Sequence, residues 1–73
     1  MYTQIKFFNP NVVIYETTIN NMAVPQIGSR VFFPYIEKYK KSMFKAVSVD
    51  YVYGKAESHI EVILKEVYHD EVW

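Results

Sequence analysis

The residues of this chain that could do chemistry are two histidines and the carboxylates near them. His69, Asp70 and Glu71 are consecutive in the last part of the sequence, and His59 precedes them. Zinc sites place their ligands at characteristic separations and often use cysteine, which this chain lacks. His69, Asp70 and Glu71 are consecutive, so they do not have the spacing of zinc ligands. We therefore predict a solvated acidic tail, with no metal site and no cofactor.

A catalytic acid and base would need a second group held beside one of these residues. Asp50 and Glu61 can meet across a hairpin as a pair of carboxylates, and His59 is expected next to Glu61 on the outer side of its strand. Surface carboxylates are far commoner than acid–base pairs, and no serine lies in the context of an activated nucleophile. The sequence therefore predicts that the protein is not an enzyme.

A lysine-rich segment over 35–45 also carries aromatic residues and is a candidate for binding. Proteins that bind single-stranded nucleic acid combine lysines for phosphates with aromatic rings for bases. The net charge of the chain is zero, which argues against a dedicated nucleic-acid protein, and in the competing interpretation the aromatics belong to the core. Nucleic-acid or nucleotide binding is the alternative function. Its residues would be Lys38, Tyr39, Lys40, Lys41 and Lys45.

Length and composition place these side chains on a single domain, residues 1–73. The chain is 51% hydrophobic and 18% aromatic, which is typical of a folded protein. A domain this small without disulfides must gain stability from a well-packed core or from self-association. We see no signal peptide and no apolar run that could span a membrane, so we expect a cytoplasmic location.

Alternation of apolar and polar residues predicts five strands that must position the candidate residues. They are expected over 2–8, 12–19, a short run after Gly28, 44–53 and 59–67. The first two and the last two should form hairpins. Between the hairpins, Pro25 cannot donate a ladder hydrogen bond and Gly28 permits a positive φ, so a sharp corner is expected there.

The segment between the third and fourth strands is ambiguous. Ile36, Tyr39, Met43 and Phe44 have a helical spacing, and Pro34 suits the start of a helix. We predict a short helix or helical turn over 35–43, with an extended loop as the alternative.

The alternation also assigns side chains to faces. We expect Val31 and Phe33 to point inward and Phe32 outward. In the fourth strand, one side should carry Val47, Val49, Tyr51 and Tyr53, and the other Ala46, Ser48, Asp50 and Val52. In the fifth strand, the inward residues should be Ile60, Val62 and Leu64. Five strands and one corner predict an all-β fold, a five-stranded antiparallel small barrel.

The order of strand starts from Pro25 onward resembles that of SH3-like small barrels. The pattern P-x-x-G-x-x-V is followed by "FKAVSVDYVY", a turn and "IEVIL", over roughly residues 24–67. In particular, it looks like short uncharacterised proteins of bacteriophages and mobile elements. This chain differs in having Gly28-Ser29 where such barrels often carry Gly-Asp, and in its longer segment "PYIEKYKKSM". The resemblance implies an SH3-like barrel, a phage origin, and inhibition of a host defence system as a role.

Apolar residues are expected on both faces of the sheet, which favours an interaction surface. Large exposed apolar patches are uncommon on monomers, although a second small core under the 34–43 segment or the tail would also account for them. We predict a non-enzymatic interaction module that binds a protein partner through an aromatic β-surface. The predicted partner-binding residues are Phe8, Phe32, Tyr35, Tyr39 and Trp73.

Charge is distributed unevenly, with a basic segment over 30–45 and an acidic one over 46–73. Two-fold symmetry could pair the basic segment of one subunit with the acidic segment of the other. We therefore predict a homodimer with Trp73 or Phe32 at or near the interface.

Overall fold

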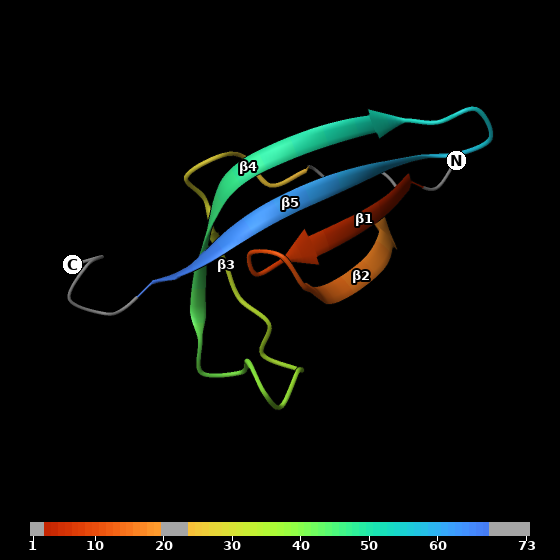
Figure 1. Cartoon of the computed structure of the whole chain (residues 1–73). Helices are drawn as coiled ribbons and strands as arrows, with labels where there is room; N and C mark the ends of the chain where they lie inside the picture. The colour runs from red at the N-terminus through yellow and green to blue at the C-terminus, as the bar shows by residue number, and fades with distance from the viewer. Residues whose placement is uncertain (1–2, 20–23, 68–73) are drawn as a thin grey trace.

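A single five-stranded sheet makes up the fold of the computed structural model, which describes residues 3–19 and 24–67 (Figure 1). The strands lie in the order β2-β1-β5-β4-β3, and the sheet is curled like part of a barrel. Their bounds are β1 Thr3–Phe8, β2 Val13–Ile19, β3 Arg30–Val31, β4 Met43–Tyr53 and β5 Ser58–Val67. The described residues include no helix long and apolar enough to cross a membrane. The prediction of an all-β, barrel-like fold is confirmed.

Both predicted hairpins are present. β1 pairs with β2 and β4 pairs with β5, each in antiparallel fashion. The first turn is closed by the Asn9 N–H, which donates to the carbonyl oxygen of Val12 at 2.9 Å. In the second, the Gly54 N–H donates to the carbonyl oxygen of Glu57 at 3.0 Å. A Cβ atom at position 54 would lie 2.4 Å from that same oxygen, so this tight turn requires glycine.

The sheet is mixed, so the prediction of a wholly antiparallel sheet is wrong. β1 pairs with β5 in parallel, with Ile5 opposite Ile60 and Phe7 opposite Val62. The chain reverses direction at every connection, which makes each pair of consecutive strands antiparallel. The first and fifth strands consequently run in the same direction, and the pairing that joins the two hairpins has to be parallel.

The predicted corner between the hairpins is confirmed at Gly28, whose φ is +93°. Glycine adopts this backbone conformation without the steric cost that a Cβ would add. The Ser29 N–H closes the turn onto the carbonyl oxygen of Gln26 at 3.0 Å. Beyond the turn, the Gly28 N–H donates to the Ala46 carbonyl at 2.8 Å, and the Ala46 N–H donates to the Ser29 carbonyl at 2.9 Å. The corner thus places residues 28 and 29 beside the edge of β4, where β3 then begins.

The segment over 35–43 forms no helix, and of the structures predicted for it only turns are present. Three successive hydrogen bonds run from the N–H of Ile36 to the Phe33 carbonyl, from Tyr39 to Ile36, and from Ser42 to Tyr39, at 3.2, 2.9 and 3.0 Å. Each bond joins residues three positions apart, and the residue at the end of one turn begins the next. Such turns bring Phe33, Ile36 and Tyr39 to the same side, which explains an apolar spacing that looks helical.

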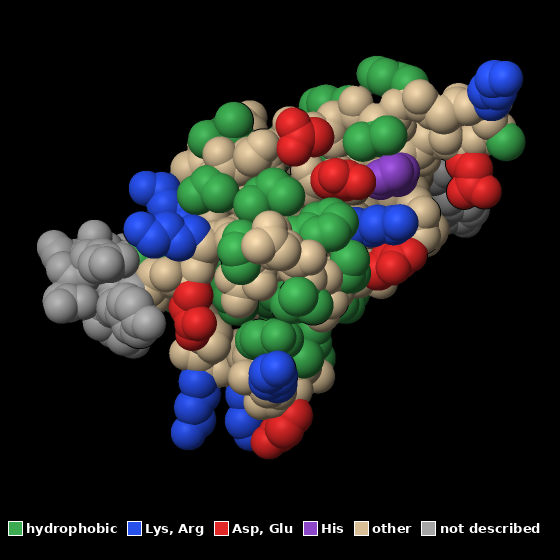
Figure 2. Space-filling view, viewed as in Figure 1, with side chains coloured by type: hydrophobic (Ala, Val, Ile, Leu, Met, Phe, Trp, Pro, Cys, Tyr) green, Lys and Arg blue, Asp and Glu red, His purple; other side chains and the backbone are tan. Residues whose placement is uncertain are grey.

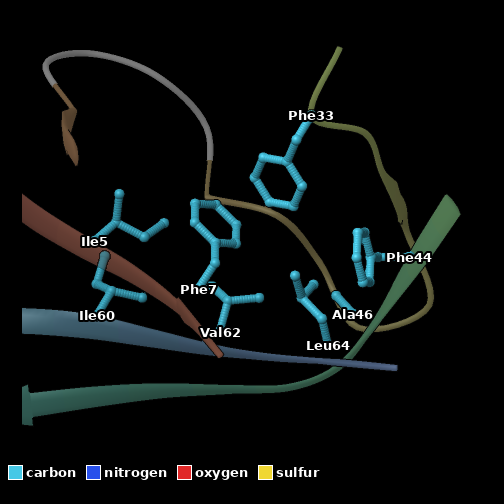
Figure 3. Close-up of a cluster of buried hydrophobic side chains, with 8 residues drawn as sticks. All are labelled: Ile5, Phe7, Phe33, Phe44, Ala46, Ile60, Val62 and Leu64. Carbon is cyan, nitrogen blue, oxygen red and sulfur yellow. The ribbon is translucent and has the colours of Figure 1, made fainter. Parts of the chain in front are cut away.

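The core lies on the concave face of the sheet (Figure 3). β1 and β5 line it with alternate residues, β4 adds two from its first half, and Phe33 covers them from the segment after β3. The buried cluster consists of Ile5, Phe7, Phe33, Phe44, Ala46, Ile60, Val62 and Leu64. The inward assignment of Phe33 and of the three β5 residues is confirmed, as is the outward position of Phe32, which is 56% exposed.

The faces predicted for the fourth strand are only partly right, because a β-bulge interrupts it. Ala46 pairs with Leu64 and Ser48 with Ile63, so Val47 is an extra residue without a partner on β5. Before the bulge Ala46 is fully buried, contrary to prediction, and Val47 is exposed. An extra residue shifts the alternation of side chains by one position. The predicted faces are therefore correct only for the residues that follow the bulge.

Phe44→Ala tests the dependence of the fold on this core. Phe44 has no exposed surface, and its ring packs edge-on against those of Phe33 and Tyr39, with centroids 5.6 and 5.7 Å away. Truncating a buried phenylalanine costs about 3–5 kcal/mol. We expect urea denaturation to show a loss of that size in the free energy of unfolding. Tyr35→Ala, at a 99% exposed position, should change it by less than about 0.5 kcal/mol. Equal losses for the two variants would contradict the described core.

Candidate interaction groove

An apolar groove lies on the concave side, between the β1–β2 hairpin and the segment that follows β3. Its volume is about 360 Å³. In the sheet order, β2 and β3 are the two edges, so the groove occupies the place where a closed barrel would pair them. None of its lining residues carries a charge. They are Ile5, Phe7, Tyr15, Thr17, Thr18, Ile19, Pro25, Val31, Phe32, Phe33, Pro34, Tyr35 and Ile36.

Three aromatic rings bridge the two sides of the groove. Phe7 from β1, Tyr15 from β2 and Phe33 from the segment after β3 contact one another. Their ring centroids are separated by 5.9 Å for Phe7–Tyr15, 5.5 Å for Phe7–Phe33 and 5.4 Å for Tyr15–Phe33. Aromatic pairs at these separations are favourable beyond the area they bury. The rings therefore hold the two unpaired edges of the sheet at a fixed spacing and leave an apolar surface between them.

The rim of the groove carries exposed aromatic residues beside a proline. Phe32 is 56% exposed and Tyr35 is 99% exposed, and Pro34 lies between them. Proline has a fixed φ and no N–H, so the backbone of this rim is restricted at Pro34 and has no donor there. Two of the five predicted partner-binding residues are thus brought to one site.

Two other predicted partner-binding residues, Tyr39 and Phe8, do not line this groove. Tyr39 is partly buried and packs against the core, so the competing interpretation of that aromatic is confirmed. Phe8 lies opposite Val13 on β2 and Ile63 on β5. Trp73 is outside the described residues. Sequence reasoning missed Tyr15 and Thr17, because their role depends on β2 lying across from the segment after β3.

The lysines of the alternative site divide between the turn segment, which holds Lys38, Lys40 and Lys41, and β4, which holds Lys45. Lys40 forms an exposed ion pair with Glu37 at 3.0 Å, and the Lys38 ammonium lies 5.5 Å from the centre of the Tyr39 ring. Lys41 is exposed in the turn segment. Lys45 lies apart from them, within β4. The four lysines therefore do not form one patch, because Lys45 is separated from the three in the turns.

Lys45 instead belongs to a cross-strand row of cations, which we call the basic row. It lies opposite Arg30 on β3 and opposite Lys65 on β5. Directly opposite residues of neighbouring strands project from the same face and lie close together. Sequence reasoning missed Arg30 and Lys65 as partners of Lys45, although the β4–β5 hairpin register would have indicated the second.

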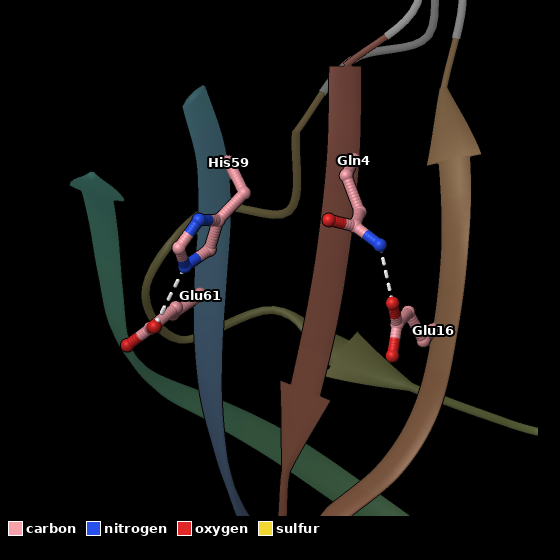
Figure 4. Close-up of polar contacts among 4 residues, drawn as sticks. All are labelled: Gln4, Glu16, His59 and Glu61. Atoms are coloured by element: carbon pink, nitrogen blue, oxygen red, sulfur yellow. Dashed lines mark hydrogen bonds and ion pairs between the residues drawn. The ribbon is translucent and has the colours of Figure 1, made fainter. Parts of the chain in front are cut away.

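The convex face carries a polar network in the middle of the sheet (Figure 4). The His59 ring and the Glu61 carboxylate are 2.8 Å apart, as the sequence predicts, and Gln4 donates to Glu16. Asp50 lies opposite Glu61 across the hairpin, which confirms that pairing too, and accepts a hydrogen bond from Ser48 at 3.1 Å.

Hydrophobic side chains gather beside these polar groups on the same face (Figure 2). Phe8 and Ile63 are partly buried neighbours, and Val13, Val47 and Val52 are 41, 44 and 37% exposed. Within residues 3–19 and 24–67, no three histidine or acidic side chains are grouped so that they could hold a metal ion. This face thus carries apolar side chains beside acidic ones (Figure 2), whereas the lining of the groove has no charged residue.

Lys45→Glu tests the basic row. Like charges directly opposite one another destabilise a sheet, and opposite charges stabilise it. A glutamate between Arg30 and Lys65 should raise the free energy of unfolding by roughly 0.5–1 kcal/mol at low salt, and less at 1 M salt, where screening is strong. Lys41→Glu, outside the row, should not stabilise the protein. Destabilisation by Lys45→Glu at low salt would show that these side chains do not repel one another.

Comparisons with known proteins place this chain in no family. No protein-family model matches it, and neither a curated protein nor a solved structure does so. The function of the groove and of the basic row must therefore be inferred from their own residues.

Proposed function

We propose that this protein is a non-enzymatic interaction module whose groove binds an extended segment of a partner protein. The observation that carries the proposal is the position of the groove, which has an unpaired strand edge as one wall and exposed aromatics as the other. Extended peptides often bind by adding a strand to such an edge. Backbone hydrogen bonds then supply affinity, and pockets for alternate side chains supply specificity.

β2 offers the features that this binding mode needs. It is seven residues long and pairs only with β1 among the described strands, so its other edge has backbone groups available. Tyr15, Thr17 and Ile19 alternate along it and all line the groove. A bound strand would present every second side chain to this surface.

The chemistry of the lining defines the partner segment. Because the lining has no charged residue, a charge inserted there would lose its hydration without gaining a counter-ion. The bound segment should therefore carry uncharged, apolar residues at the positions that face the groove. Phe32 and Tyr35 on the rim can close over them, as aromatic residues commonly do in the centres of interfaces.

The biological setting of this activity follows from the resemblance to SH3-like barrels and short phage proteins. Phage or mobile-element origin, a role against a host defence system and a cytoplasmic location remain predictions. An open groove on a barrel-like sheet agrees with such a role, because an inhibitor needs only to bind and occlude its target.

Selection from a random peptide library on the immobilised protein tests this function. Enriched peptides should carry apolar residues at every second position and no charge at those positions. The double variant Phe32→Ser, Tyr35→Ser should bind them at least about tenfold more weakly, a loss of about 1.4 kcal/mol, because it removes the exposed aromatics of the rim.

Val12→Ser provides the matched control. Val12 is 65% exposed and does not line the groove, so its replacement should leave peptide affinity unchanged. No enrichment of peptides, or equal binding by the wild type and the rim variant, would contradict the proposal.

The basic row favours nucleic-acid binding as a second candidate function. Arg30, Lys45 and Lys65 are consecutive across three strands and are all exposed, so they could contact phosphates along a backbone. Each phosphate neutralised on a single strand contributes about 0.7 to the slope of log K against log salt. The neutral net charge weighs against this function, as the sequence already indicated.

Titration with labelled single-stranded oligonucleotides at low salt distinguishes this candidate. The row predicts a salt slope of about −2 for three contacts, which Lys45→Glu should reduce sharply. Lys40→Glu, outside the row, should have a much smaller effect. Absence of binding at tens of micromolar protein would remove nucleic acid as a ligand.

A further inference from the structure

The second half of β4 has an edge that no described strand covers. β4 runs for eleven residues, but β3 pairs only with Lys45 and Phe44 at its beginning. The corner at Gly28 then turns the chain away from β4. We call residues 47–53 the open edge of β4, which lies along the outside of the sheet in Figure 1.

Backbone groups of three residues point out of this edge. The Ala46 N–H donates to Ser29 and the Ala46 C=O accepts from Gly28, both just before β3, so the Ala46–Leu64 pair makes no ladder bonds between β4 and β5. Pairs in an antiparallel ladder alternate between bonded and non-bonded. Every second residue of β5 before Leu64, namely Val62, Ile60 and Ser58, therefore also belongs to a pair without hydrogen bonds between β4 and β5. These partners, whose N–H and C=O point outward, are Val49, Tyr51 and Tyr53.

The side chains of the open edge resemble those of strands that pair with another strand, because they are mostly aromatic or β-branched. Tyr51 is 57% exposed, Tyr53 is 83% exposed and Val52 is 37% exposed. Edges that must stay unpaired are usually protected by lysine, proline or a covering segment. The sequence "VSVDYVY" contains neither lysine nor proline, and Asp50 is its only charge.

We propose that two copies of this chain pair through their open β4 edges, antiparallel and centred on Tyr51. In this register Tyr51 lies opposite Tyr51 of the second copy, and Val49 lies opposite Tyr53. All three outward-pointing residues then meet as hydrogen-bonded pairs. The two five-stranded sheets become one continuous sheet across a two-fold axis.

Charge disfavours the register centred on the neighbouring residue, Asp50. Centring on Asp50 would place two carboxylates directly opposite, about 4.5–5.5 Å apart between Cβ atoms, which is destabilising. Centring on Tyr51 places Asp50 opposite Val52 of the second copy. Aromatic and β-branched residues then face one another on the concave side, and such cross-strand pairs stabilise sheets.

The pairing goes beyond the proposed binding function and does not depend on it. None of residues 47–53 lines the groove, so each copy keeps its groove open in the dimer. The sequence predicts a homodimer with Phe32 or Trp73 at the interface. The pairing proposed here instead places the contact between the two copies at the open edge of β4. Trp73 lies outside the described residues.

Single cysteines test the register, because the chain has no cysteine of its own. A hydrogen-bonded pair has Cα atoms about 5.5 Å apart, within disulfide range, so Tyr51→Cys should form a disulfide-linked dimer of twice 8.7 kDa on mild oxidation. Val49→Cys and Tyr53→Cys are matched controls. Their cysteines would lie four residues apart along the strands, about 13 Å, and should remain unlinked.

Light scattering of the variants tests the dimer itself. The wild type should have twice the monomer mass, and Tyr51→Lys should halve it, because two ammonium groups would face each other across the axis. Tyr35→Lys, at an exposed position away from β4, should remain dimeric. Circular dichroism checks that each variant is folded, and the cysteine series does not depend on the lysine variant.

Three outcomes would overturn the proposal. They are a monomeric wild type at all concentrations, faster cross-linking at position 49 or 53 than at 51, and a folded Tyr51→Lys variant that stays dimeric. Peptide binding in the groove can succeed or fail independently of each of these results.

Discussion

The fold depends on the parallel pairing between β1 and β5. This ladder is where the N-terminal hairpin joins the C-terminal one within the sheet, and four buried residues lie along it, Ile5 and Phe7 opposite Ile60 and Val62. Because these residues alternate in both strands, they face the same side and form the centre of the core. The aromatic cluster of Phe7, Tyr15 and Phe33 rests on this centre and sets the width of the groove.

Local patterns in the sequence predict the elements well, because each depends on residues close to one another. The five strands, both hairpins, the positive φ at Gly28 and the inward side of β5 follow from alternation and turn chemistry. The parallel pairing could not be read in this way, since it depends on which edges meet after the chain has reversed several times. The segment after β3 illustrates the same limit, because turns that repeat every three positions and a helix produce nearly the same apolar spacing.

The candidate site was predictable only in part, for a related reason. Phe32 and Tyr35 could be identified as exposed aromatics from their own neighbourhood. The wall opposite them comes from β2, and nothing in the local sequence shows that β2 lies across from the segment after β3. A single extra residue, Val47, also moved part of β4 to the other face, and bulges leave no clear mark in an alternating sequence.

The β1–β5 ladder also bears on how the protein folds. Its two strands lie at opposite ends of the chain, so the contact that joins the hairpins closes the longest loop in the molecule. Contacts between distant segments slow folding, because loop-closure entropy must be lost before the contact stabilises anything. On the ribosome, β1 and β2 emerge first and must wait for β5. Until β5 is synthesised, one edge of β1 has no partner strand and the apolar side of the N-terminal hairpin lacks the rest of the core, so this nascent hairpin is exposed to aggregation.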